Sequence, residues 1–271
     1  YGATTAHNIP NNPTNSGTLT NYGVLAIEQN YTKTLSTPVS VDGIQILSAS
    51  ASCVLADGGN LITGPGSSLG TIYMAAASQF TLTNTNVNPF PEFKYNQIAS
   101  NAVVNYNTTA TAQNIRDLSA PGYGFVNIIA NGGVKSLTGP TWLQSTLTVN
   151  AATQNTTLNL NGQTLYVASA TPLTLATASV FTGNAAGSTI HCYGNLASTL
   201  NIAATTITGG KLANLISSNT NASGVILGAF NNAGTVWTID NLTINTGATF
   251  AINQRTLNLN DAYTNNGNLI G

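Results

Sequence analysis

Short apolar–polar alternations that recur every seven or eight residues constrain the fold of this chain more than any other feature. The runs begin 11, 7 and 8 residues apart in one region and 8 and 7 residues apart in another. They are Leu147–Val149, Leu158–Leu160, Leu165–Val167, Leu173–Leu175, Leu242–Ile244, Phe250–Ile252 and Leu257–Leu259. Alternation with a period of two is typical of a strand that buries one face, and no helical period competes with it. The sequence therefore predicts an all-β fold of very short strands, with apolar side chains inward and Thr or Asn outward.

The spacing of these runs separates two all-β architectures. Sandwiches and barrels prefer longer strands with turn signals every 8–12 residues or so. A parallel β-solenoid instead packs three very short strands into a coil of about 20–25 residues. The second pattern fits residues 140–271 better, so we expect a parallel β-solenoid (β-helix) with Asn, Thr and Gly turns. A β-sandwich or jelly-roll subunit is the alternative.

The scarcity of charge agrees with stacked coils. Charged residues make up 5% of the 271 residues, against about 25% in typical domains, while the chain has 41 Thr and 37 Asn. Stacking places like residues above one another, and ladders of amides or hydroxyls avoid the repulsion of stacked charges. A net charge of −1 gives no basic surface for nucleic acid, and no apolar run is long enough to span a membrane. We therefore expect neither a nucleic-acid partner nor membrane insertion.

Composition shifts divide the chain into an arm and a main domain. Residues 1–22 contain Pro10 and Pro13 and lack apolar alternation, which indicates a polar N-terminal arm or cap. Residues 23–271 are expected to form the solenoid-like domain. The stretch 87–98, with Pro89 and Pro91, breaks the pattern, so a loop or a junction between two modules is expected there.

The first residue and the two cysteines bear on the compartment. The chain begins at Tyr1 rather than Met, so we expect a mature or excised segment. Few Lys and Glu with abundant Thr, Asn, Ser and Gly fit a secreted or cell-surface protein. Cys53 and Cys192, 139 positions apart, either form one disulfide or are two separate buried thiols.

Candidate catalytic and metal-binding residues are sparse. Asp240 and Asp261 are 21 positions apart, about one coil, as a pair of glycosidase carboxylates could be, yet turn positions explain both. His191 and Cys192 are adjacent and on a strand would point to opposite faces, so they do not readily share a metal. We expect no enzymatic activity, no metal site and no cofactor.

Two side-chain arrays could bind a ligand. A carbohydrate-stacking stripe requires that six tyrosines fall on one face, namely Tyr73, Tyr95, Tyr106, Tyr123, Tyr166 and Tyr193. An ice-binding face requires a flat regular array of Thr pairs. The pairs Thr18–Thr20, Thr81–Thr83, Thr146–Thr148 and Thr206–Thr208 are separated by 63, 65 and 60 residues, and this irregular spacing favours ordinary strand threonines.

The order of motifs between residues 95 and 167 resembles a known family. Val103–Asn107, Ala112–Ile115, Phe125–Ile129 and Val134–Gly139 lead to Leu147–Val149 and then to Leu158–Leu165. This order is similar to the modules of large repetitive surface proteins exported by type IX secretion in gliding and related bacteria. The resemblance covers roughly residues 95–270 and implies an extracellular parallel β-helix that serves as an adhesin stalk or filament subunit. It offers no catalytic residues.

Together these features predict an extracellular structural protein, a subunit or stalk segment of a cell-surface filament or adhesin. Assembly would join strand ends, with Ile9 and Leu19 contributing from the arm and Leu269 and Ile270 from the C-terminal pattern. The expected partners are further copies of the chain or neighbouring modules of the same surface protein, with a glycan as a further candidate. The alternative is a carbohydrate-binding or, less favoured, an ice-binding β-helical module.

Overall fold

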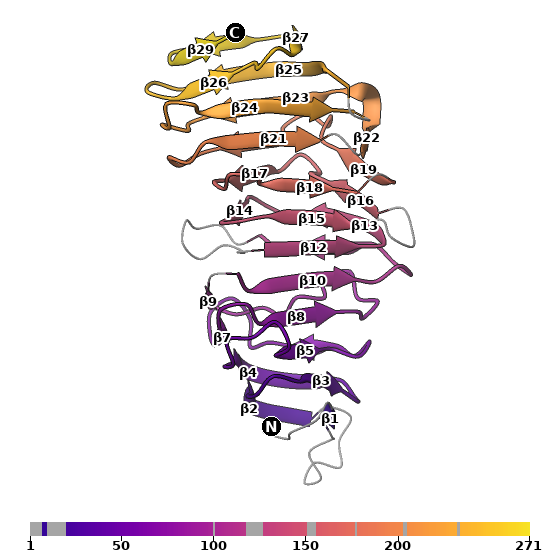
Figure 1. Cartoon of the computed structure of the whole chain (residues 1–271). Helices are drawn as coiled ribbons and strands as arrows, with labels where there is room; N and C mark the ends of the chain where they lie inside the picture. The colour runs from indigo at the N-terminus through magenta and orange to yellow at the C-terminus, as the bar shows by residue number, and fades with distance from the viewer. Residues whose placement is uncertain are drawn as a thin grey trace.

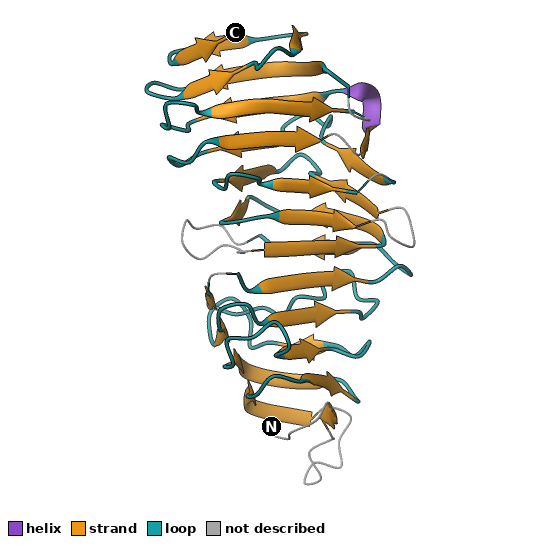
Figure 2. Cartoon of the chain, in the orientation of Figure 1, coloured by secondary structure: helices purple, strands orange, loops and turns teal. Residues whose placement is uncertain are grey.

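The fold is a parallel β-solenoid, as the spacing of the apolar runs predicts. A computed structural model describes residues 7–9, 20–99, 101–117, 127–150, 156–176, 178–202, 205–231 and 234–271. Figure 1 shows coils stacked along one axis, from the N-terminus at the bottom to the C-terminus at the top. Among the described residues, the 3-10 turn η1 (Thr208–Gly210) is the one helical element, and all other elements are strands (Figure 2).

The first face of the solenoid is an eight-stranded parallel sheet. Its strands in spatial order are β1 (His7–Ile9), β3 (Thr32–Leu35), β5 (Val54–Ala56), β8 (Gln79–Leu82), β10 (Val103–Asn107), β12 (Asn127–Asn131), β15 (Leu147–Asn150) and β18 (Leu173–Leu175). From β5 to β12 successive strands begin 25, 24 and 24 residues apart. That interval is the length of one coil, close to the expected value.

The same face continues toward the C-terminus as a four-stranded sheet, because β18 is followed by its spatial neighbour β21. The strands of this sheet are β21 (Ser198–Ile202), β24 (Val225–Phe230), β26 (Thr249–Ala251) and β29 (Asn268–Ile270). The second face is a five-stranded sheet of β11 (Gln113–Ile115), β13 (Gly133–Leu137), β16 (Thr156–Asn159), β19 (Ser179–Thr182) and β22 (Thr205–Ile207).

Two sheets build the remaining side. The sheet near the N-terminus consists of β2 (Thr20–Ile27), β4 (Val39–Ile46), β7 (Thr71–Met74) and β9 (Tyr95–Ile98), with β6 (Ile62–Thr63) also paired to β4. The sheet toward the C-terminus consists of β14 (Thr141–Leu143), β17 (Thr164–Val167), β20 (Thr189–Cys192), β23 (Leu212–Ser217), β25 (Val236–Ile244) and β27 (Thr256–Leu259), with β28 (Tyr263–Asn265) paired to β25. All these strand pairs are parallel.

The core is a continuous apolar column along the axis. On the first face each inward position lies directly above the next, in the order Leu55, Phe80, Val104, Ile128, Leu147 and Leu173, and none of these side chains is more than 3% exposed. Burying each such side chain stabilises the fold by roughly 1.5–3 kcal/mol. Cys53 and Cys192 also lie in the core, where both are free thiols.

Some inward positions are occupied by polar residues, although the alternation pattern predicts that polar residues face outward. Lys33, Asp57 and Lys135 are fully buried. The Lys135 ammonium donates a hydrogen bond of 2.8 Å to the carbonyl oxygen of Thr108. The Asp57 carboxylate accepts from the backbone N–H groups of Thr83 and Asn84 at 2.8–3.0 Å. A buried charge requires such partners, so these contacts replace the water that each group loses.

The two irregular segments expected from the sequence have definite places in the fold. His7–Ile9 of the expected arm forms β1 and pairs with β3 in the first coil, and β2 begins at Thr20. The stretch 87–98 begins in an excursion between β8 and β9 and ends in β9 itself, which pairs with β7. The excursion folds back on the preceding coil, where it forms one wall of a cleft described below.

Candidate functional site

The C-terminal coil presents strand edges to solvent. Its strands are β27, β28 and β29, and within the described part of the chain each of them pairs with the preceding coil only. The free edge of a parallel strand carries unpaired N–H and C=O groups that can accept a further strand. Leu269 and Ile270, two of the expected assembly residues, lie in β29 at this edge.

Two inward positions of this coil carry exposed side chains with large apolar surfaces. Leu269 lies on Phe250, and Tyr263 lies on Leu242, in consecutive coils. Phe250 and Leu242 are 0% and 1% exposed, whereas Leu269 and Tyr263 are 38% and 45% exposed. The same position in the coil is therefore buried one layer inside and open at the end. Ile270 is 40% exposed beside Leu269.

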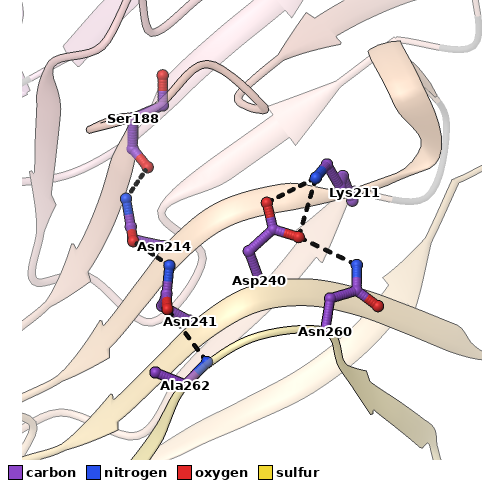
Figure 3. Close-up of polar contacts among 7 residues, drawn as sticks. All are labelled: Ser188, Lys211, Asn214, Asp240, Asn241, Asn260 and Ala262. Carbon is purple, nitrogen blue, oxygen red and sulfur yellow. Dashed lines mark hydrogen bonds and ion pairs between the residues drawn. The ribbon is translucent and has the colours of Figure 1, made fainter.

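An ion pair between two inner coils and an asparagine of the last coil meet at Asp240. Figure 3 shows the Lys211 ammonium donating to both carboxylate oxygens of Asp240, at 2.7 and 3.0 Å, while the side-chain amide of Asn260 donates to Asp240 at 3.0 Å. The hydrogen bond from Lys211 holds the pKa of the Asp240 carboxyl below its usual range. The backbone N–H of Asp261 donates to the Asp240 carbonyl oxygen at 3.0 Å, so the two expected carboxylate positions adjoin in successive coils.

An asparagine ladder runs beside this ion pair (Figure 3). Asn214 donates to the Ser188 carbonyl oxygen at 3.0 Å, Asn241 donates to the side-chain oxygen of Asn214 at 3.0 Å, and the backbone N–H of Ala262 donates to Asn241 at 3.2 Å. The ladder thus crosses four coils, from Ser188, just before β20, to Ala262, just before β28. The Asn260 and Ala262 hydrogen bonds therefore hold the last coil on the coil before it.

The N-terminal edge has a matching construction. Within the described residues, β1 pairs only with β3 and β2 pairs only with β4. The backbone of Ile9 lies in β1 opposite Leu35. Leu19, the remaining expected assembly residue, lies outside the described residues. β1 and β29 lie on the same face at opposite ends of the column (Figure 1).

The six tyrosines do not form a single stripe. Tyr106 is fully buried, Tyr73 and Tyr95 lie in β7 and β9, and Tyr123 lies outside the described residues. Burial raises the pKa of the Tyr106 hydroxyl far above its usual range. Among the described members of this set, Tyr166 and Tyr193 lie together, beside Trp142 and His191, which do not belong to the set of six.

This aromatic cluster is a cross-strand stack. The rings of Trp142 and Tyr166 are parallel within 4° with centroids 3.9 Å apart, and His191 lies 5.0 Å from Tyr166 on the next strand. Tyr193 meets Trp142 edge-on at 5.0 Å. Stacking along the axis covers ring faces that a sugar would need, so the cluster chiefly reinforces the sheet.

The side chains of His191 and Cys192 lie on opposite faces of the sheet. His191 faces outward and its Nε2 lies 2.8 Å from the Ser218 hydroxyl oxygen, while partial burial lowers the pKa of the imidazole. Cys192 is fully buried in the core, which raises the pKa of its thiol to about 12. Across the described residues, no group of three or more His, Cys, Asp or Glu side chains could hold a metal ion.

The threonine pairs do not make one array. Thr81 and Thr148 lie on the first face, in β8 and β15, whereas Thr206 lies on the second, in β22. Thr18 is outside the described residues. On the first face, the outward positions from β8 to β15 read Thr81, Asn105, Ile129 and Thr148, which is not a regular threonine row.

A cleft of about 670 Å³ opens on the flank of the N-terminal half. Its walls come from four successive coils: residues 61–64, the excursion residues 86–92, residues 114–117, and Thr138. Glu92, Arg116 and Asp117 line it, three of the 13 charged side chains in the chain. The Arg116 guanidinium donates to the Glu92 carboxylate at 2.8 Å. The prolines of the stretch 87–98 predict an irregular segment, but no motif in the sequence identifies these residues as a site.

Comparison with known proteins adds no relative from which a role could be carried over. A scan against protein-family models and searches of curated proteins and of solved structures return no match for this chain. Within the described part of the chain, no helix is both long and apolar enough to cross a bilayer. The geometry of the column, its C-terminal edge and its cleft is therefore the ground on which function is inferred.

Proposed function

We propose that this chain is an extracellular structural protein, a stalk or filament segment whose column is extended by a further β-coil stacked on its C-terminal end. The observation that carries the proposal is the uncovered last coil. Its inward residues Tyr263 and Leu269 occupy positions that are buried one coil earlier, and its three strands are ordered but paired on one side.

The source of the added coil is a second copy of the chain or a neighbouring module of the same surface protein. A head-to-tail contact between copies joins two different surfaces and does not close on itself, so it builds a fibre. The low charge and the Asn- and Thr-rich ladders support an extracellular setting, as does the resemblance to repetitive surface proteins exported by type IX secretion. The proposal assigns the chain a mechanical role, with no catalytic step.

The test compares two substitutions at apolar residues of equal exposure. Leu269→Lys places a charge on the C-terminal edge, where Leu269 is 38% exposed, whereas Val134→Lys places one in the middle of the column, where Val134 is 39% exposed. We expect concentration-dependent fibres or head-to-tail oligomers of the unmodified chain in negative-stain electron microscopy and sedimentation. Leu269→Lys should abolish them and Val134→Lys should keep them.

One result would contradict the proposed contact, and a second would remove the filament form of the proposal. Fibres that survive Leu269→Lys would move the contact away from the C-terminal edge. Discrete monomeric rods at every concentration would exclude a filament of this chain alone and leave only the stalk form, in which the added coil belongs to a longer protein.

A second candidate function, carbohydrate binding, is favoured by a separate observation. The cleft on the flank is concave and collects charged and amide side chains in a chain that has few charges. A stalk that carries such a site would act as a glycan-binding module as well as a spacer.

A further inference from the structure

The lining of the cleft narrows what it could bind. Its polar groups are the amides of Asn86, Asn88 and Asn114, the hydroxyls of Thr63 and Thr138, and the charged groups of Glu92, Arg116 and Asp117. Amides both donate and accept hydrogen bonds, carboxylates only accept and guanidinium only donates. A ligand that satisfies all of them must itself both donate and accept at closely spaced points.

The charged side chains of the cleft disfavour a simple anion or a simple cation as its ligand. Glu92 and Asp117 carry negative charge and Arg116 carries positive charge, so the cleft has a formal charge of −1 with both signs present. An anion would meet two carboxylates. A cation would find the Glu92 carboxylate already paired with Arg116 at 2.8 Å. Neutral hydroxyl groups, which donate to carboxylates and accept from guanidinium and amides, fit every part of this lining.

The floor of the cleft is apolar. Ile62 and Phe90 are 2% and 4% exposed, and Pro91 is also buried. An apolar floor with a rim of amides and charged groups is the usual construction of a small-molecule site, and a volume near 670 Å³ falls within the ~300–1,000 Å³ range of such sites. Sugar rings present C–H groups on their faces and hydroxyls at their edges, so they match both parts.

Hydrogen bonds hold the wall formed by the excursion in a fixed shape. The Asn88 backbone N–H donates to the Asn86 side chain at 2.8 Å, and the Asn114 side chain donates to Asn88 at 2.7 Å. The Arg116 guanidinium also reaches the Pro91 carbonyl oxygen at 3.4 Å.

The opposite wall approaches so closely that it requires a glycine. A Cβ atom at Gly64 would lie 2.3 Å from the Glu92 carbonyl oxygen. The Gly66 backbone N–H donates to that same oxygen at 3.2 Å. Since both walls are fixed in the free protein, a ligand would lose little free energy to ordering them.

We propose that this cleft is a binding site for a neutral oligosaccharide, recognised through its hydroxyl groups. The inference rests on the carbohydrate-binding candidate and names its site and ligand class. It does not depend on coil stacking, because the cleft is lined by residues between 61 and 138. The stacking edge is formed by β27, β28 and β29 at the C-terminal end of the column (Figure 1).

The experiment measures binding of the full chain to an array of neutral glucan, mannan, galactan and xylan oligosaccharides, with sialylated and sulfated glycans on the same array. Isothermal titration then gives the affinity for the best neutral oligosaccharide. Two variants alter exposed residues of the cleft: Asp117→Ala removes an acceptor and Thr138→Trp fills space. Their matched controls at exposed positions elsewhere are Asp261→Ala and Thr174→Trp.

We expect a neutral oligosaccharide to bind, with affinity reduced about tenfold or more in both cleft variants and unchanged in both controls. Binding that persists in the cleft variants but is lost in Trp142→Ala would overturn the cleft as the site while keeping carbohydrate binding, at the aromatic cluster. Binding only to sialylated or sulfated glycans would overturn the inference. No binding to any glycan on the array would overturn it as well and would also remove carbohydrate binding altogether.

Discussion

At the scale of single residues, the inward-facing charges show how few polar groups this core tolerates without partners. Asp57 is fully buried and accepts hydrogen bonds from the backbone of Gly59, Thr83 and Asn84 and from both of the latter side chains. These donors come from the turn after β5 and from the segment after β8, so one carboxylate connects two coils. A carboxylate suits this position because it accepts only, and every neighbour donates.

Asp57→Asn tests that connection. The substituted amide would direct N–H donors at N–H donors, so we expect a loss of about 2–4 kcal/mol in the free energy of unfolding. Chemical denaturation monitored by circular dichroism measures the loss. Asp42→Asn, at an exposed position, should leave stability nearly unchanged, and equal effects of the two substitutions would contradict the role given to Asp57.

Lys135 makes stability depend on pH. Burial lowers the pKa of its ammonium from 10.5 to about 8. Between these values the unfolded chain binds more protons than the folded chain, so the contribution of Lys135 to stability rises with pH. Below pH 8 the free-energy cost of burying the charged ammonium is fully present. Cys192, whose thiol has a raised pKa of about 12, acts in the opposite direction above pH 9, so a difference between variants is needed.

We therefore expect Lys135→Met to be more favourable relative to the unmodified chain at pH 7.5 than at pH 10.5, with the difference changing by about 2 kcal/mol. Denaturant titrations at four pH values across this range measure it. Lys94→Met, which removes an exposed lysine, serves as the control. A constant difference for Lys135→Met would show that the lysine is not desolvated in the folded state.

At the scale of strands and turns, asparagine ladders join successive coils. Asn241 both donates to Asn214 and accepts from the Ala262 backbone N–H. Asn241→Ala should lower the free energy of unfolding by about 1–2 kcal/mol. It should also speed hydrogen exchange at Ala262 and in the adjoining β28, because the Ala262 N–H loses its acceptor and the start of β28 is held less firmly on β25. Asn258→Ala, at an exposed residue of the neighbouring strand, should do neither, and exchange unchanged in Asn241→Ala would show that the ladder does not hold the last coil.

The strands themselves could be predicted from the sequence, and the cleft could not. Leu147–Val149, Leu165–Val167 and Leu173–Leu175 lie in strands β15, β17 and β18, because period-two alternation depends only on local residues. The cleft needs residues 61–64, 86–92 and 114–117 to meet, and that meeting depends on how one excursion folds back. The prolines at 89 and 91 signalled an irregular segment but not its direction.

Inward lysines escaped prediction for a related reason. Lys135 stands two positions before Leu137 and shares its inward phase, yet a charged residue was expected to face outward. Its placement depends on the Thr108 carbonyl oxygen in the preceding coil, 27 positions earlier. Trp142 was missed because its outward ring finds Tyr166 only through the register between β14 and β17.

At the scale of the whole molecule, each coil contacts only its neighbours, so stability is close to a sum over coil–coil interfaces. The coils of β10 and β12 have an interface on each side, whereas the last coil has one within the described chain. We expect hydrogen exchange to be slowest in β10 and β12 and fastest in β28 and β29. Exchange measured by mass spectrometry on the dilute chain checks this gradient, and equal protection throughout would contradict it.

The parallel pairing of the coils also determines how the column responds to force. Its inter-strand hydrogen bonds lie along the long axis, so tension between the two ends loads them lengthwise and opens them a few at a time. One coil, such as the 24 residues from Gln79 to Val103, would release about 80 Å of extended chain as it detaches. Such a column would yield in regular steps under load and lengthen many times over before it parted, absorbing a sudden pull at one end instead of passing it on.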